Sequence, residues 1–213
     1  VGVIDRNDSA WQKDVEAGKS ATPRSVVARE SLPPIAHMLN AFDFERAAER
    51  VMDPAAWAYY DSGGDDEKTL RENRAVFSRI WLRPRVMVNV KHVSTACSLL
   101  GTRSRSPLYV SATALARLAD PAGEVAIVRG CHRAGDTLYM LPTLSSCSLM
   151  EMTAARAASQ TQWFQLYVNP DRSKTEELVR RAEGLGCRAL FITVDAPQLG
   201  RRERDMRFKA PQK

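Results

Sequence analysis

The distribution of apolar and polar positions divides the chain into a polar beginning, a helical stretch and a region of alternating strands and helices. Residues 1–40 show little hydrophobic periodicity, contain many polar residues and end in Ser31-Leu32-Pro33-Pro34. A segment of this composition cannot bury enough apolar surface to fold by itself. We therefore expect residues 1–40 to form a poorly ordered extension or linker, and residues 41–213 to form the folded domain.

Three helices are predicted directly after the linker. Asp43 can cap the first, and Asp53-Pro54 begins the second, with proline at a favoured first-turn position. Gly63-Gly64 ends the second helix. The third is expected from about Glu67 to Ile80, because four apolar residues recur there on one helical face: Leu70, Val76, Phe77 and Ile80.

The pattern changes near residue 107, where short apolar runs typical of buried strands alternate with helical patterns. The four runs are Leu108–Ser111, Thr137–Leu141, Trp163–Val168 and Ala189–Val194. The helices between them are expected to open at Asp120-Pro121, Ser148 and Asp171. Strict alternation of this kind indicates βα units and a parallel sheet.

Four βα units correspond either to half of an eight-stranded barrel or to a small open sheet. A complete barrel needs about 250 residues, and the region after residue 107 is much shorter than that. The predicted fold class is therefore α/β: an incomplete (β/α)8 TIM barrel of about four βα units, preceded by a helical N-terminal segment. Its first and fourth strands would have unpaired apolar edges, so we expect a homo-oligomer or association with a complementary half.

The bulk composition excludes several classes of protein. The net charge is +6, but the 31 basic residues are scattered among 25 acidic ones without a long basic block, so a nucleic-acid-binding protein is not favoured. The apolar runs are too short to span a membrane. The four cysteines are far apart and form no CxxC pair, which argues against a zinc site, another metal centre or a disulfide scaffold: Cys97, Cys131, Cys147 and Cys187. Reduced thiols and the lack of a visible targeting signal suggest an intracellular protein, cytoplasmic or mitochondrial.

Candidate chemistry lies at the carboxyl ends of the predicted strands, where βα folds carry their active sites. Polar residues follow the first two strands at Ser111–Ala114 and Thr143–Ser146. A spacing of two places Gln165 and Tyr167 on one face of the third strand, and Thr193 and Asp195 on one face of the fourth. Hydroxyl, amide, phenol and carboxylate groups of this kind suit a polar heterocycle and a small anion better than a metal ion.

Several motifs in one order resemble the FMN-dependent 2-hydroxy-acid dehydrogenases and oxidases, and most closely the flavin domain of flavocytochrome L-lactate dehydrogenases. The resemblance covers about residues 33–208. Its motifs are Trp57–Glu67, Arg71-Glu72-Asn73, Ser111–Ala114, Gln165–Val168, Thr193–Pro197 and Leu199–Glu203 with Asp205. Each motif alone is weak, but the ordered series is specific.

The resemblance implies FMN as the cofactor and assigns roles to residues of this chain. The backbone at Ala112, Thr113 and Ala114 would run along the flavin ring. The side chains that would hydrogen-bond the ring are Ser146, Gln165 and Thr193.

The resemblance also implies a set of substrate and catalytic residues. Tyr59 would hold the substrate carboxylate, Tyr167 would contact the hydroxyl side of the substrate, and Arg202 would be a cationic partner of substrate and flavin. Asp195 would orient a catalytic histidine. Taken singly, each residue also fits a structural role, for example Arg202 pairing with Asp205 at the surface.

The expected activity is FMN-dependent oxidation of a small L-2-hydroxy acid, with L-lactate as the expected substrate and an unknown electron acceptor. Such chemistry needs a general base, which is usually a histidine. The chain contains only His37, His92 and His132, none of which follows a predicted strand. We therefore expect a fragment that lacks the catalytic base. The alternative is a catalytically silent half barrel that serves in binding or assembly.

Overall fold

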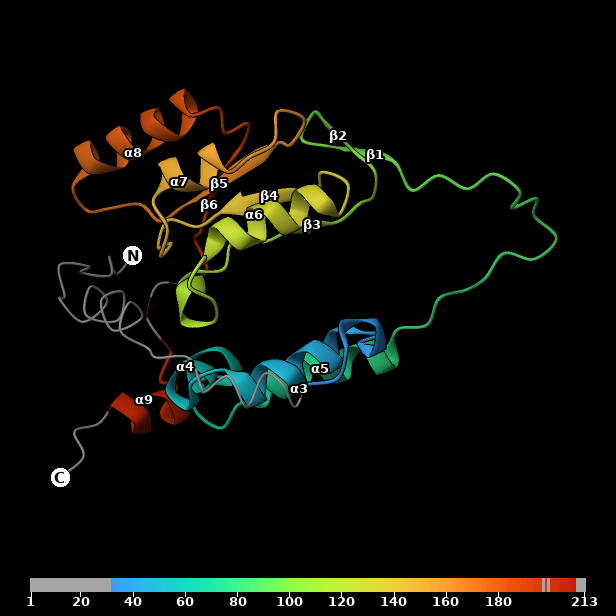
Figure 1. The fold of residues 1–213 in the computed structure, drawn as a ribbon, viewed down its shortest axis with the longest axis horizontal. Helices are drawn as coiled ribbons and strands as arrows, with labels where there is room; N and C mark the ends of the chain where they lie inside the picture. The colour runs from blue at the N-terminus through green and yellow to red at the C-terminus, as the bar shows by residue number, and fades with distance from the viewer. Residues whose placement is uncertain (1–31, 197, 199, 210–213) are drawn as a thin grey trace. The chain divides into compact units, whose positions relative to one another are not determined.

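The computed structural model describes residues 32–196, 198 and 200–209, which fall into two compact units. The sheet unit comprises described residues from Val93 to Gln198, and the helical unit comprises residues 32–92 and 200–209. Figure 1 shows the elements of each unit. The predicted extension, residues 1–40, lies mostly outside the described residues. Its described part contains one short 3₁₀ helix, η1 (Ile35–His37).

The helical unit begins with α3 (Ala41–Val51) and α4 (Pro54–Asp61), which pack against each other. Asp53 caps α4 as predicted and accepts a hydrogen bond from the backbone of Ala55 at 2.8 Å. The prediction that Asp43 caps the first helix is wrong. Asn40 is the N-cap, and Asp43 is the third helical residue, whose side chain bonds back to the Asn40 backbone in a capping box.

The third predicted helix is shorter and less buried than its apolar pattern indicates. It forms α5 (Lys68–Ala75) and continues as the 3₁₀ helix η2 (Val76–Arg79). Phe77 and Ile80 are 71% and 58% exposed, so this face is not covered within the described residues. A final helix, α9 (Glu203–Lys209), packs on α4 and was not predicted, because its sequence is almost entirely charged.

The sheet unit contains the predicted parallel sheet. Its strands follow the order β3-β4-β5-β6, and every neighbouring pair is parallel. An antiparallel hairpin that was not predicted precedes them. The elements are β1 (Cys97–Leu99), β2 (Thr102–Ser104), β3 (Tyr109–Val110), η3 (Ala116–Leu118), α6 (Glu124–Arg133), β4 (Leu138–Leu141), α7 (Leu149–Ala154), β5 (Gln162–Leu166), α8 (Arg172–Gly184) and β6 (Leu190–Ile192).

The three crossover helices all cover the same face of the sheet (Figure 1). Side chains of α6, α7 and α8 pack with one set of alternating strand residues, which includes Tyr139, Leu141 and Phe164. The other set, Leu138, Met140 and Trp163, forms a separate small core on the opposite face. Helices on one face only are typical of barrel sheets, whereas doubly wound sheets are covered on both faces.

The sheet is open within the described residues, with β3 and β6 at its two edges. Leu190 and Ile192 on β6 are 43% and 53% exposed. The prediction of an α/β fold with a parallel sheet is therefore confirmed, and no barrel is closed by the residues described.

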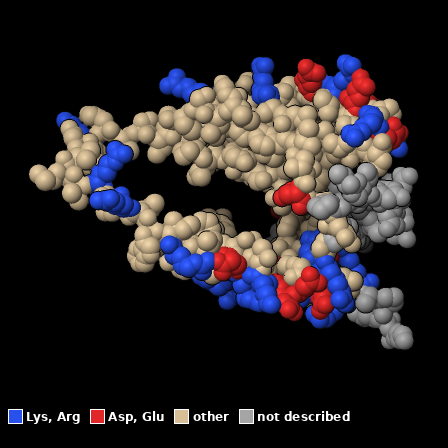
Figure 2. Space-filling model, turned by 180° about the vertical axis from the view of Figure 1, so that it is seen from behind, with Lys and Arg blue, Asp and Glu red and all other residues tan. Residues whose placement is uncertain are grey.

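Basic and acidic side chains alternate on the face of the helical unit that Figure 2 displays. Local ion pairs account for several of them, including Arg46 with Asp43 at 2.5 Å and Arg74 with Glu45. Within the described part of the chain, no helix is both long and apolar enough to cross a lipid bilayer.

Candidate functional site

A cavity of about 360 Å³ lies at the carboxyl ends of the parallel strands in the sheet unit. It is formed by the segments that follow β3 and β4 and by the last residues of β5 and β6 with their continuations. Six of the residues that the sequence singles out line it: Ala112, Ala114, Gln165, Tyr167, Thr193 and Asp195.

Gln165 and Thr193 are joined by a hydrogen bond across β5 and β6. The amide nitrogen of Gln165 donates to the Thr193 hydroxyl at 2.9 Å, and the amide oxygen accepts from the Thr143 backbone at 3.1 Å. The Thr143 hydroxyl accepts from the Tyr167 backbone at 3.1 Å. Gln165 is therefore fixed in one orientation, while one amide N–H of Gln165 and the Thr193 hydroxyl proton remain able to donate to a ligand.

Aromatic side chains form an apolar wall on the same face of the sheet. The rings of Tyr109 and Phe191 lie 5.2 Å from the Trp163 ring between centroids. Trp163 is 2% exposed and belongs to the small core with Met140. Tyr109, Met140 and Phe191 also line the cavity. One side of the cavity is therefore apolar and aromatic, and the other offers hydrogen-bond donors.

Ser146 and Thr113, two further residues that the resemblance assigns to the flavin, do not line this cavity. The Ser146 hydroxyl donates to the buried carboxylate of Glu124 at 2.7 Å and accepts from the Arg117 backbone at 2.9 Å. Thr113 is exposed, between Ala112 and Ala114 that line the cavity.

Glu124 holds two loops of this region together, and sequence reasoning missed it. It is fully buried at the start of α6, and its carboxylate accepts hydrogen bonds from the backbones of Ala116, Ser146 and Cys147 at 2.9–3.0 Å. Burial is the largest influence on the pKa of Glu124 and raises it, but these hydrogen bonds together hold the pKa below its ordinary value. The carboxylate thereby joins the segment after β3 to the loop after β4. The sequence signal that could have identified Glu124 is an acidic residue at the start of the helix that begins Gly123-Glu124-Val125-Ala126.

In the helical unit, Arg202 and Tyr59 contact each other. The Arg202 guanidinium lies 4.4 Å from the centre of the Tyr59 ring and donates to the Tyr59 carbonyl at 3.3 Å. Asp205, the surface partner considered for Arg202, is buried and forms an ion pair with Lys209 at 3.2 Å. The structure therefore brings together two of the residues that the resemblance assigns to the substrate.

Arg204, which the sequence did not single out, holds α9 against α4. Its guanidinium donates to the Asp61 side chain and carbonyl at 2.6 Å each and to Glu67 at 2.7 Å. These hydrogen bonds, first that to Asp61, raise the pKa of Arg204. The hydrogen bond from Arg204 is also the first cause of the lowered pKa of Glu67. Arg204 thus fixes the segment that carries Arg202.

A cavity at the carboxyl ends of parallel strands and helices on one face of the sheet are both typical of α/β proteins of barrel type. The chain belongs to the FMN-dependent dehydrogenase family, whose model matches residues 48–213. It is 51% identical over 180 residues to an L-lactate dehydrogenase (cytochrome) of Wickerhamomyces anomalus and 43% identical over 171 residues to 2-hydroxyacid oxidase 1 of Homo sapiens. These matches cover 84% and 79% of this chain.

A solved structure shows the same fold. The flavin-binding domain of baker's yeast flavocytochrome b2 matches with a TM-score of 0.82 and 44% identity, over 92% of this chain and 49% of that one. The chain spans 31% of the length of the Wickerhamomyces enzyme and 46% of the human oxidase.

Proposed function

We propose that the chain is part of an FMN-dependent enzyme that oxidises a small L-2-hydroxy acid, with L-lactate as the substrate. The observation that carries the proposal is the cavity at the carboxyl ends of β3–β6, where the fixed Gln165–Thr193 pair faces an apolar wall. Hydrogen-bond donors opposite an apolar aromatic wall fit a planar heterocycle that has hydrogen-bond acceptors along one edge. When bound, FMN would supply the acceptor for the two electrons that the substrate loses on oxidation.

In the sheet unit, we assign flavin binding to the backbone of Ala112, Thr113 and Ala114 and to the side chains of Gln165 and Thr193. Gln165 and Thr193 would donate hydrogen bonds to the ring. Ser146 would act only after a rearrangement, because Glu124 and Arg117 bond both its hydroxyl and its backbone groups in this structure.

We assign the substrate to Tyr59, Tyr167 and Arg202. A tyrosine hydroxyl and a guanidinium are suited to a carboxylate, since both donate hydrogen bonds and the guanidinium adds charge. Arg202 stacked on Tyr59 loses little side-chain freedom on binding, because both groups are already held. Asp195 would hold and orient a histidine base and stabilise its protonated form.

We further propose that the parallel sheet is the first half of a (β/α)8 barrel and that the base comes from outside this sequence. His37 and His92 belong to the helical unit, and neither residue is on a strand or directly after one. His132 lies on α6 and bonds Asp136 at 2.6 Å, on the helix-covered side of the sheet.

A visible spectrum of the purified chain tests the proposal directly. FMN is added, excess is removed, and L-lactate is then added without oxygen. We expect retained flavin whose colour does not bleach, because residues that bind the ring are present and the base is not. Bleaching would overturn the missing-base part of the proposal. Absence of flavin binding would instead favour a silent half barrel.

Substitution of Gln165 tests the assignment of the flavin site. We expect Gln165→Leu to weaken FMN binding about tenfold or more, since it removes a donor and leaves the Thr143 backbone N–H without its acceptor. Fluorescence quenching of FMN measures the affinity. Gln162→Leu is the matched control, because Gln162 lies on the same strand and bonds the Met152 carbonyl on the helix side. Equal losses in both variants would contradict the assignment.

A further inference from the structure

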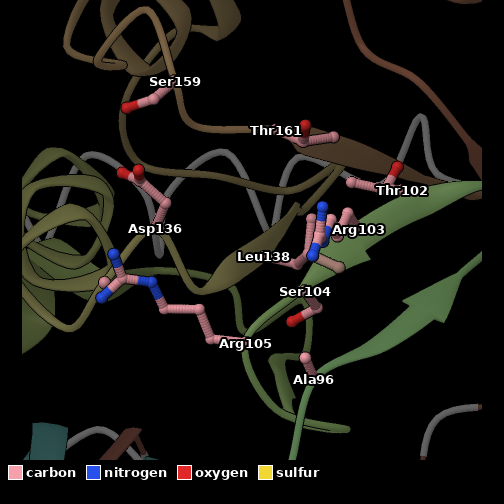
Figure 3. Close-up of a pocket in the computed structure, with 10 residues that line it drawn as sticks. Ala96, Thr102, Arg103, Ser104, Arg105, Asp136, Leu138, Ser159 and Thr161 are labelled. Carbon is pink, nitrogen blue, oxygen red and sulfur yellow. The ribbon is translucent and has the colours of Figure 1, made fainter.

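A second cavity, of about 380 Å³, lies at the amino-terminal ends of the parallel strands (Figure 3). Its walls come from the β1–β2 hairpin, from the turn that leads into β4 and from the residues just before β5. It shares no lining residue with the carboxyl-end cavity. The two cavities therefore lie at opposite ends of the strands, and the second has no part in the function proposed above.

Two arginines of the hairpin line this cavity. Arg103 and Arg105 are separated by two positions, the spacing that places side chains on one side of an extended chain. Gly135 leaves space for the second guanidinium, because a Cβ atom at Gly135 would lie 3.1 Å from Arg105 Nη1. Among the described residues, Arg103 forms no ion pair, so its charge is available to a ligand.

One carboxylate, Asp136, also lines the cavity. Its oxygen lies 2.6 Å from His132 Nδ1, so this carboxylate already has a hydrogen-bond partner. The pKa of Asp136 is lowered by that hydrogen bond first, then by one from Ser159, and by the charge of Arg105 among other causes. The cavity is therefore lined by two guanidinium groups and one carboxylate, and only Arg105 acts on that carboxylate, so the lining keeps one positive charge in excess.

Hydroxyl groups complete the wall. Thr102 of β2 and Ser159 and Thr161 of the segment before β5 line the cavity together with the arginines (Figure 3). Leu138, the first residue of β4, contributes an apolar surface. Two arginines on a hairpin would ordinarily be solvated surface residues. Here both are exposed, yet together with hydroxyl groups they line one cavity that is open to solvent, and its volume of about 380 Å³ lies in the range of about 300–1,000 Å³ found for small-ligand sites.

We propose that this cavity binds a small anion that bears a phosphate group. The guanidinium fork matches the spacing of phosphate oxygens and can form two parallel hydrogen bonds, and neutral hydroxyls bind the remaining oxygens. A carboxylate ligand would use fewer of these donors. The cavity volume leaves room for a short organic group, so the source is either free phosphate or a small phosphate monoester.

Nuclear magnetic resonance of the full chain, titrated with inorganic phosphate at constant ionic strength, locates the site. We expect saturable shifts in the amide signals of residues 102–105, 135–136 and 159–161, and none at 111–114 or 165–167. Glycerol 3-phosphate in place of phosphate distinguishes the two sources, since tighter binding of the monoester means that its organic group is also bound. No saturable shift with either anion, or shifts at the carboxyl-end cavity instead, would overturn the proposal.

Three charge-matched variants provide the second test. We expect Arg103→Gln and Arg105→Gln each to weaken phosphate binding about tenfold or more. Arg129→Gln removes the same charge from exposed α6 outside the cavity, and we expect no more than about a twofold effect because exposed charges act weakly in salt. Equal weakening in all three would mean attraction to net charge only and would overturn the site. If a glutamine variant does not fold, Arg103→Lys keeps the charge but loses the fork and should still weaken binding.

Discussion

Replacing Glu124 by glutamine is expected to destabilise the chain by about 2–4 kcal/mol at neutral pH. The carboxylate of Glu124 accepts four hydrogen bonds, three from backbone N–H groups and one from the Ser146 hydroxyl. Glutamine has one acceptor oxygen, and its amide N–H₂ would face donors that have lost their partner. Because all these groups are buried or half-buried, water cannot replace the lost acceptor at low cost. Denaturant unfolding followed by circular dichroism measures the difference.

The same residue gives the stability a defined dependence on pH. The pKa of Glu124 is lowered in the folded chain, so its carboxylate contributes stability that is fully present above its ordinary value of 4.5. That contribution is lost as the pH falls through the lowered pKa. The free-energy difference between the wild-type chain and Glu124→Gln should therefore be largest at neutral pH and shrink below about pH 4.5.

Glu177→Gln is the matched control for this prediction, because Glu177 is exposed on α8. Its effect should stay within about 0.5 kcal/mol. A neutral-pH loss at Glu124 no larger than that at Glu177 would show that the buried carboxylate does not organise the loops. We also expect Glu124→Gln to retain less flavin than the wild-type chain, since Ser146 and the Ala112–Ala114 segment lie on the two stretches that Glu124 joins.

Most of the sheet could be predicted from the sequence because its strands are short apolar runs separated by helical patterns. The predicted start of α6 at Asp120-Pro121 is wrong, since Gly123 is the N-cap and Asp120 accepts from the Ala122 backbone in the turn before the helix. Asp171 and Ser148 cap α8 and α7 as their sequence pattern indicates. The β1–β2 hairpin could not be found in this way, since its strands are three residues each and read Cys-Ser-Leu and Thr-Arg-Ser. Their pairing depends on the turn at Leu100 and Gly101, both with positive φ.

The candidate site likewise contains some contacts that the sequence could predict and others that it could not. Gln165 and Thr193 could be placed together because strand alternation and parallel order decide which side chains meet. The contacts of Arg202, Arg204 and Glu124 could not, since each joins segments distant in sequence through a single side chain. Arg202 and Tyr59, for example, are 143 positions apart, and no periodicity connects them. The cavity at the amino-terminal ends of the strands was missed for the same reason, because nothing in the sequence places Arg103 and Arg105 beside Ser159 and Thr161.

Trp163→Ala is expected to cost about 3–5 kcal/mol, the usual loss for a fully buried aromatic side chain. Trp163 is 2% exposed, and its ring contacts Tyr109 and Phe191 on the inner face of the sheet. The buried indole N–H has no hydrogen-bond partner among the described residues, so its removal returns a small part of that cost. Because a domain is stable by only about 5–15 kcal/mol, the variant should lose much of its cooperative thermal transition.

Trp81→Ala is the matched control for Trp163→Ala, since Trp81 is 86% exposed and the two substitutions delete the same atoms. We expect its thermal midpoint to stay near that of the wild-type chain, because exposed substitutions change stability by about 0.5 kcal/mol or less. If Trp163→Ala lowered the thermal midpoint no more than Trp81→Ala, the sheet face with Leu138, Met140 and Trp163 would not be a packed core in this chain. A large loss confined to Trp163 would mean that the aromatic wall of the carboxyl-end cavity is formed by the sheet unit itself, and the flavin site would then have its apolar side in place before any ligand binds.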